Sequence, residues 1–235
     1  MKRILASAVA IAAVTALAGA VNAADIRRPP PPVAKAPAFM APPFSWTGFY
    51  VGANLGYGWG DGSGTMTAGG ATGRISGSGG GVLGGGQIGY NWQTGVFVFG
   101  VETDFQATGA DGDFRGTLAP GAVAVVGTTE TPWFGTIRGR LGYAADRWLF
   151  YVTGGGAYTE NEARGTVGGV PSSASAVGWS WTVGGGIETA VTNNWSIKGE
   201  YLYIATPDKV PVLAGGTLRG DTDTHVLRLG VNYHF

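Results

Sequence analysis

The C-terminal segment 222–235 alternates between apolar and polar positions. Its odd-numbered positions carry Leu227, Leu229, Val231, Tyr233 and Phe235, and its even-numbered positions carry Val226, Arg228, Gly230, Asn232 and His234. Successive side chains of a β-strand point to opposite faces, so this pattern predicts a strand with one apolar side and one mostly polar side. Such a strand suits a transmembrane β-barrel, in which lipid contacts one face and the polar lumen the other.

The same alternation recurs along the chain. It predicts strands at 46–59, 80–93, 95–107, 130–145, 147–159, 177–191, 194–206 and 222–235. Short turns at 93–95, 145–147 and 192–194 alternate with long, glycine-rich connections at 60–79, 108–129, 160–176 and 207–221, which are typical of mobile surface loops. We therefore expect an all-β fold: an eight-stranded antiparallel transmembrane β-barrel with short periplasmic turns and four long extracellular loops.

Aromatic residues gather at both ends of the predicted strands. Near the short turns lie Tyr90, Trp92, Phe97, Tyr143, Trp148, Trp195, Tyr233 and Phe235, and near the long connections lie Tyr57, Trp59, Phe105, Trp133, Tyr158, Trp179 and Tyr203. Amphipathic rings concentrate at the two membrane interfaces. A soluble barrel such as a lipocalin would turn polar residues outward, so the two belts favour a membrane barrel.

The N-terminus indicates the compartment, and the composition excludes several kinds of site. Lys2 and Arg3 precede an apolar run and the small residues up to Ala23, which predicts a signal peptide over 1–23. Residues 24–45 form a proline-rich linker, expected to be an extended periplasmic tether, and 46–235 form the barrel. The chain has no cysteine, which excludes disulfides, thiol catalysis and zinc–thiolate sites. It has no basic patch, so we expect no nucleic-acid partner.

Charged residues within the predicted strands fall on the inward face. They are Glu102, Asp104, Glu188 and Glu200 together with Arg138, Arg140, Lys198 and Arg228. The interior of an eight-stranded barrel is only wide enough for side chains to fill it. We therefore favour an ion network that plugs the lumen over the alternative, a narrow path for ions or solutes lined by these residues.

Residues suited to catalysis or metal binding are few. His225 lies near Asp221 and Asp223 at the outer rim, where a histidine is usually just solvated, and His234 lies at the periplasmic rim. We expect no enzyme activity, no bound metal and no cofactor. Glycine triplets at 84–86, 154–156 and 184–186 lie within strands without a following helix, which excludes a phosphate-binding loop. They give room for large inward Arg and Tyr side chains or permit sharp strand coiling.

Several segments resemble a known family. They are WTGFYVGANLGYGWG, GGQIGYNWQTG, VFGVETDFQ, GTIRGRLGYAADRWLFYVTGGGAY, WTVGGGIETAVTNNWSIKGEYLY and HVLRLGVNYHF. Together they resemble the small outer-membrane β-barrel proteins of alphaproteobacteria, often described as outer-membrane immunogenic or "porin family" proteins, with an OmpA-like membrane barrel. The resemblance implies an abundant, surface-exposed and often antigenic protein of the cell outer membrane. It also implies that Phe235 is the terminal aromatic read by the barrel-assembly machinery.

The function expected from these observations is structural. We predict a monomer in contact with outer-membrane lipids and lipopolysaccharide, which supports envelope integrity and presents its extracellular loops as a surface antigen. The alternative is a small porin for passive diffusion of ions or small solutes.

Overall fold

The computed structural model describes residues 44–206, 210–213 and 216–235. Their strands are β1 Gly48–Ala68, β2 Ala71–Thr94, β3 Phe97–Ala119, β4 Val123–Ala145, β5 Trp148–Val167, β6 Val170–Ala190, β7 Trp195–Thr206, β8 Val210–Val212 and β9 Gly216–His234. No helix in these ranges is long and apolar enough to cross a membrane. The predicted signal peptide and most of the predicted linker lie outside the described residues.

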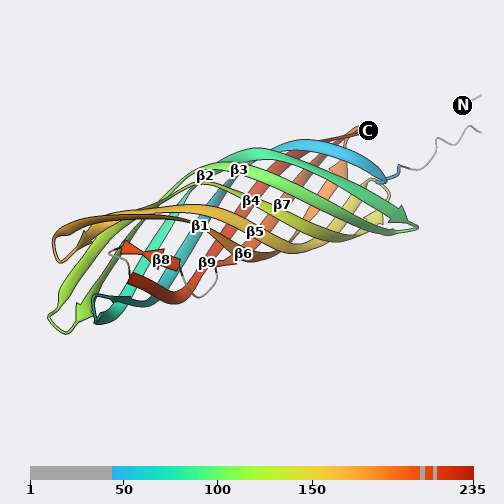
Figure 1. The fold of residues 1–235 in the computed structure, drawn as a ribbon. Coiled ribbons are helices and arrows are strands. Elements are labelled where there is room, and N and C mark those ends of the chain that lie inside the picture. The colour runs from blue at the N-terminus through green and yellow to red at the C-terminus, as the bar shows by residue number, and fades with distance from the viewer. Residues whose placement is uncertain (1–43, 207–209, 214–215) are drawn as a thin grey trace, which may run out of the picture. The chain divides into compact units, whose positions relative to one another are not determined.

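Eight of the strands form a closed ring (Figure 1). Neighbouring strands β1 to β7 pair antiparallel in chain order, β7 pairs with β9, and β9 pairs with β1, while β8 adds a short ladder to β9. Between the aromatic belts, closure lets the backbone N–H and C=O groups pair with neighbouring strands, as a membrane span requires. The predicted eight-stranded antiparallel barrel is confirmed.

The two ends of the ring differ. At the end with the turns 95–96, 146–147 and 191–194, which we call the short-turn end, the strands stop close to the aromatic residues. At the opposite end, which we call the hairpin end, β1 to β6 continue well beyond the outer aromatic residues before they turn. The C-terminus lies at the short-turn end, where β1 begins (Figure 1). By the usual rule for outer-membrane barrels, the short-turn end faces the periplasm and the hairpin end faces the exterior.

The connections at the hairpin end differ in conformation from the expected loops. Segments 60–79, 108–129 and 160–176 are paired strands that continue β1 to β6 past the outer aromatic residues. The β1–β2 ladder, for example, runs unbroken to the pair Ala68↔Ala71, and Gly69 and Gly70 then form the turn with positive φ. The ladder continues because its backbone bonds need no particular side chain, and inward apolar residues such as Met66 and Ile75 pack together at the tip.

The two strand faces match the predicted alternation. Outward side chains between the belts are apolar and exposed, as at Leu229, which is 67% exposed, whereas Arg228 beside it is 1% exposed. Rings of the outer belt contact one another in a row from Phe105 through Trp133 and Tyr158 to Trp179, with centroid distances of 5.5, 6.0 and 5.8 Å. These contacts give the barrel an apolar outer surface bounded by aromatic residues, as a bilayer requires.

The interior is filled in layers along the barrel axis. The layer at the short-turn end consists of Trp46, Val98, Ala144, Leu149, Tyr151 and Ala190. The inward charged residues follow, and beyond them lies an apolar layer of Leu83, Phe134, Ala157, Leu202, Ile204 and Val226. A third apolar cluster at the hairpin end contains Met66, Ile75, Leu118, Val125 and Leu213. Polar and apolar layers therefore alternate through the lumen.

Candidate functional site: a buried ion network in the lumen

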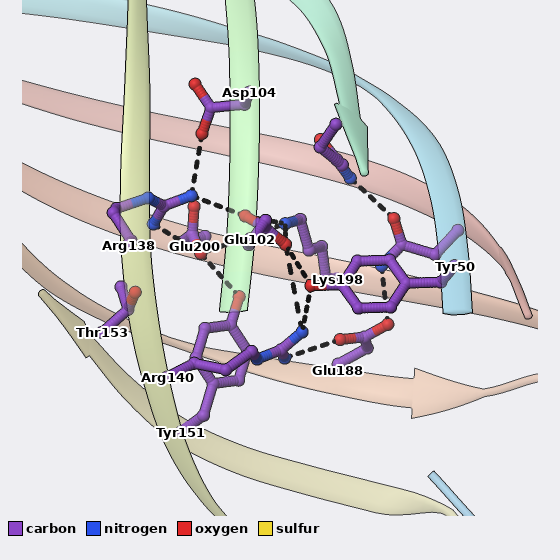
Figure 2. A network of polar contacts seen from close by, with 12 residues as sticks. Tyr50, Glu102, Asp104, Arg138, Arg140, Tyr151, Thr153, Glu188, Lys198 and Glu200 are labelled. Carbon is purple, nitrogen blue, oxygen red and sulfur yellow. Dashed lines mark hydrogen bonds and ion pairs between the residues drawn. The ribbon is translucent and has the colours of Figure 1, made fainter. Parts of the chain in front are cut away.

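The structure brings all eight predicted inward charges together. Glu102 and Asp104 come from β3, Arg138 and Arg140 from β4, Glu188 from β6, Lys198 and Glu200 from β7, and Arg228 from β9. Each is at most 5% exposed. Figure 2 shows seven of these residues converging from strands on different sides of the barrel. Alternation within each strand aims every second side chain inward, and ring closure makes these side chains meet.

Two arginines bridge the carboxylates at the centre of the network. Arg138 Nη2 lies 2.9 Å from Asp104 Oδ2 and also contacts Glu102, and its Nη1 lies 3.2 Å from Glu200 Oε2. Arg228 Nη2 lies 2.9 Å from the same Asp104 oxygen and also pairs with Glu200. The planar guanidinium presents several fixed donors, so one side chain can join carboxylates from two or three strands.

Lys198 and Arg140 extend the network toward the short-turn end. Lys198 Nζ lies 2.9 Å from Glu102 Oε2, and Arg140 Nη2 lies 2.8 Å from Glu188 Oε2. The Arg140 guanidinium also lies 4.0 Å from the centroid of the Tyr151 ring, within the range of a cation–π contact. Four cations and four carboxylates thus form one connected set.

Neutral polar groups complete the network, and the sequence reasoning did not single them out. Tyr50 Oη donates to Glu102 at 2.8 Å and Tyr151 Oη donates to Glu200 at 2.9 Å. Thr136 Oγ1 donates to Asp104 at 2.7 Å, and Asn232 Nδ2 donates to Glu188 at 2.7 Å. These residues share the inward positions of their strands, so the same alternation could have identified them. Their bonds satisfy carboxylate oxygens that water would otherwise solvate.

The two histidines lie in different environments. His234 is buried on the inward face, where its Nε2 lies 2.9 Å from Ser196 Oγ and 3.5 Å from Glu188 Oε1. His225 lies in the outer aromatic belt, stacked on Trp59 and bonded through Nδ1 to Tyr201 Oη at 2.7 Å. Among the described residues, no group of three or more His, Asp or Glu side chains is arranged to hold a metal ion.

The prediction that the glycine triplets make room for large inward side chains holds at some of their positions. A Cβ atom at Gly186 would lie 2.6 Å from Tyr151 Oη, so this glycine makes room for an inward tyrosine. A Cβ atom at Gly155 would lie 2.1 Å from the backbone oxygen of Ile137, so here the glycine permits close approach of two strands. Gly84 differs, because a Cβ atom there would make ordinary contacts at 3.5 Å.

The C-terminal Phe235 lies on the outer surface at the short-turn end. Its side chain is 73% exposed, and its ring contacts Tyr233 at a centroid distance of 5.2 Å. Its backbone N–H donates to the carbonyl of Phe49 at 3.0 Å, which fixes the chain end to β1. The terminal aromatic ring is therefore accessible from outside the barrel.

Residues just before β1 close the lumen at the short-turn end. Trp46 is fully buried, its backbone N–H donates to Gln93 Oε1 at 2.8 Å, and its ring packs edge-on against His234 at 5.6 Å. Phe44, which belongs to the predicted linker, packs on Trp46 at 4.9 Å. The sequence analysis placed Trp46 in the first strand, but β1 begins at Gly48.

Comparisons with known proteins agree with this architecture. Residues 32–235 match the model of the family described as outer membrane protein beta-barrel domain. The chain is 38% identical over 210 residues to the 31 kDa outer-membrane immunogenic protein of Brucella melitensis, covering 82% of this chain and 85% of that protein. It is 34% identical over 199 residues to a 22 kDa outer membrane protein of Rhizobium leguminosarum, covering 83% of this chain and 81% of that protein.

A solved structure shares the fold. The outer membrane protein OprG of Pseudomonas aeruginosa superimposes with a TM-score of 0.50 at 12% sequence identity, covering 80% of this chain and 96% of that one. The closed ring, the apolar outer face, the family match and the relatives place the protein in the cell outer membrane, and the chain belongs to the outer membrane protein β-barrel family.

Proposed function

We propose that this surface protein of the outer membrane is a structural barrel with a filled lumen. In this role it supports envelope integrity and presents its outer hairpins as surface antigens. The observation that carries the proposal is the layered interior: the ion network lies between two layers of buried apolar side chains. Each layer would have to move before an ion or solute could pass.

The presentation of antigenic surface rests on the hairpin end. Strands β1 to β6 extend beyond the outer aromatic belt and carry exposed polar residues into the medium, as at Asp113 and Arg164. Relatives of this chain are named immunogenic outer-membrane proteins. The proposed partners are outer-membrane lipids and lipopolysaccharide around a monomeric barrel, and the barrel-assembly machinery during biogenesis.

We do not assign an enzyme activity or a porin activity to the barrel. The histidine of the outer belt is engaged by Tyr201 and Trp59. A porin would need an open lumen, whereas guanidinium groups from β4 and β9 meet carboxylates from β3 and β7 across this one.

Conductance in planar bilayers tests the proposal. The refolded wild-type protein is expected to give no stable solute-sized openings, because the ion network and the apolar layers on either side of it block the lumen. The double variant Arg138→Ala, Arg140→Ala removes two cations from the network and is expected to give measurable ion leakage. Stable openings in the wild-type protein would refute the structural proposal and support the porin alternative.

The matched control is Arg164→Ala. Arg164 is paired with Glu162 at 3.0 Å on the outer surface, and its side chain is 65% exposed. This change removes a cation of the same type from outside the lumen, so it is expected to leave the bilayer conductance unchanged. Equal leakage from the control would show that leakage reflects general damage to the barrel instead of loss of the plug.

A further inference from the structure

The outer half of the barrel contains a cavity that the ion network does not reach. Its volume is about 320 Å³, and it lies between the apolar layer next to the network and the apolar cluster at the hairpin end. Leu83, Phe134 and Val226 form one side, and Met66, Ile75 and Leu213 form the other. Protein interiors are normally close-packed, so a cavity of this size is unexpected. The structural role proposed above does not account for it.

Glycines on β1 and β2 create much of this space. Gly58 is buried and lines the cavity, and a Cβ atom there would make only ordinary contacts, the nearest at 3.5 Å to Leu83. A larger side chain at this position would therefore project into the cavity. Gly60 and Gly62 continue the same inward face toward the hairpin end.

The cavity also presents a small polar group. Thr131 Oγ1 donates to Asn161 Oδ1 at 3.1 Å, and both residues line the cavity. Within the described residues this bond uses the oxygen of Asn161 and leaves its side-chain amide nitrogen as a donor for a bound molecule. Four carboxylates, Asp61, Asp111, Asp113 and Glu162, border the cavity, but they occupy outward positions of β1, β3 and β5, and Glu162 is paired with the exposed Arg164. The interior lining is therefore neutral.

We propose that this cavity binds a small, neutral, mostly apolar molecule of about two fused rings that carries one hydrogen-bonding group. The size follows from comparison with an engineered apolar cavity of about 150 Å³, which takes up benzene. A cavity of about 320 Å³ has room for a molecule twice that size. Pockets with mostly apolar walls and a few placed polar groups are the usual form of small-molecule sites.

The sequence supplies a specific reporter for this site. The chain has three methionines, Met1, Met40 and Met66, of which Met1 lies in the predicted signal peptide and Met66 lines the cavity at 1% exposure. Protein purified from outer membranes and labelled with [ε-¹³C]methionine should give a methyl resonance for Met66, assigned with Met66→Leu, and one for Met40 as the internal reference.

Titration with 2-naphthol, a two-ring molecule with one hydroxyl, tests the proposal. We expect a saturable shift of the Met66 methyl resonance and nuclear Overhauser contacts between that methyl and the naphthol ring protons, with no saturable shift at Met40. Shifts that grow linearly and equally at both methionines would indicate partition into the detergent micelle only and would overturn the proposal. Absence of the Overhauser contacts would overturn it as well.

A pair of glycine variants links the binding to the cavity. Gly58→Leu fills the space and is expected to abolish the saturable shift. Gly84→Leu adds the same side chain at a lipid-facing position, where a Cβ atom meets Leu55 at 3.5 Å, and should keep the wild-type affinity within about twofold. A folded Gly58→Leu protein that binds like the wild type would overturn the proposal. If Gly58→Leu does not fold, the Overhauser measurement on the wild type decides whether 2-naphthol binds in the cavity.

Discussion

At the scale of single residues, Arg138 shows how the lumen tolerates buried charge. Its guanidinium contacts carboxylates from β3 and β7, and its side chain is fully buried from solvent. A buried cation is costly unless hydrogen bonds and opposite charges surround it, and losing one partner leaves the others unpaired. Arg138 is therefore expected to be far more important for stability than an arginine on the surface.

The first prediction compares Arg138→Ala with Arg164→Ala. Loss of Arg138 should lower the free energy of unfolding by about 3–5 kcal/mol, because Glu102, Asp104 and Glu200 lose a buried partner. Loss of the exposed Arg164 should change it by about 1 kcal/mol or less. Urea unfolding of the barrels in lipid vesicles, followed by heat-modifiable gel mobility, measures both. Equal losses would contradict the assignment of a stabilising network.

At the scale of the element, β9 combines three separate roles. Its outward residues are exposed toward lipid, its inward Arg228 joins the ion network, and Phe235, which follows the strand directly, presents an aromatic ring at the barrel edge. The strand alternates strictly, so each role uses its own set of positions. Changes at neighbouring residues should consequently have unrelated effects.

The second prediction concerns the outward face of β9. Leu229→Arg places a charge among lipid-facing residues and should cost about 2–4 kcal/mol if the position lies near the bilayer midplane. Ser63→Arg is the control, because Ser63 is exposed on β1 beyond the outer belt, where a charge meets water. Unfolding in vesicles should show a loss for the first variant and almost none for the second. Equal losses of stability in the two variants would contradict the placement of the membrane between the two aromatic belts.

The third prediction concerns Phe235. Replacing it with alanine should reduce the amount of barrel in the outer membrane of cells while leaving refolding of the purified chain almost unchanged, because the ring is exposed and supports few internal contacts. Phe97→Ala removes an exposed ring at the same end, 54% exposed, and should leave outer-membrane levels near wild type. Equal reductions would indicate a general loss of aromatic belt contacts.

At the scale of the whole molecule, the barrel is asymmetric along its axis. The short-turn end is closed by Trp46 and its neighbours, and the hairpin end carries paired strands beyond the outer belt. By the usual rule for outer-membrane barrels, the hairpin end is the surface expected on the outside. An apolar layer separates the stabilising ion network from the outer cavity.

The fourth prediction tests this orientation. An epitope tag inserted between Gly69 and Gly70, at the open turn of the β1–β2 hairpin, should be labelled by antibody on intact cells. The same tag inserted after Gly95, in a short turn, should be labelled only after the outer membrane is permeabilised. All three glycines have free space around them, so the insertions should be tolerated equally. Labelling of the second tag on intact cells would show that the short-turn end faces the exterior and would contradict the expected orientation.

Much of the candidate site follows from alternation along single strands. Glu102 and Asp104, for example, occupy every second position of a strand whose other positions are mostly aromatic or aliphatic, so their inward direction could be predicted. The predicted inward set was limited to charged residues and left out Tyr50 and Tyr151, although the alternation places both on the inward face. Their hydroxyls reach carboxylates from other strands, which only the folded ring brings near.

The sequence by itself determined the strand faces, the two aromatic belts and the set of inward charges, because each depends on a period of two within a local segment. Eight repeats of that pattern indicated an eight-stranded barrel. Tertiary structure decided what depends on strands distant in the chain. It paired Asp104 with Arg228 across 124 residues, extended the ladders through glycine-rich segments expected to be loops, and left a cavity above the network. Register and closure of the ring set these features, and neither is encoded in the alternation of any one strand.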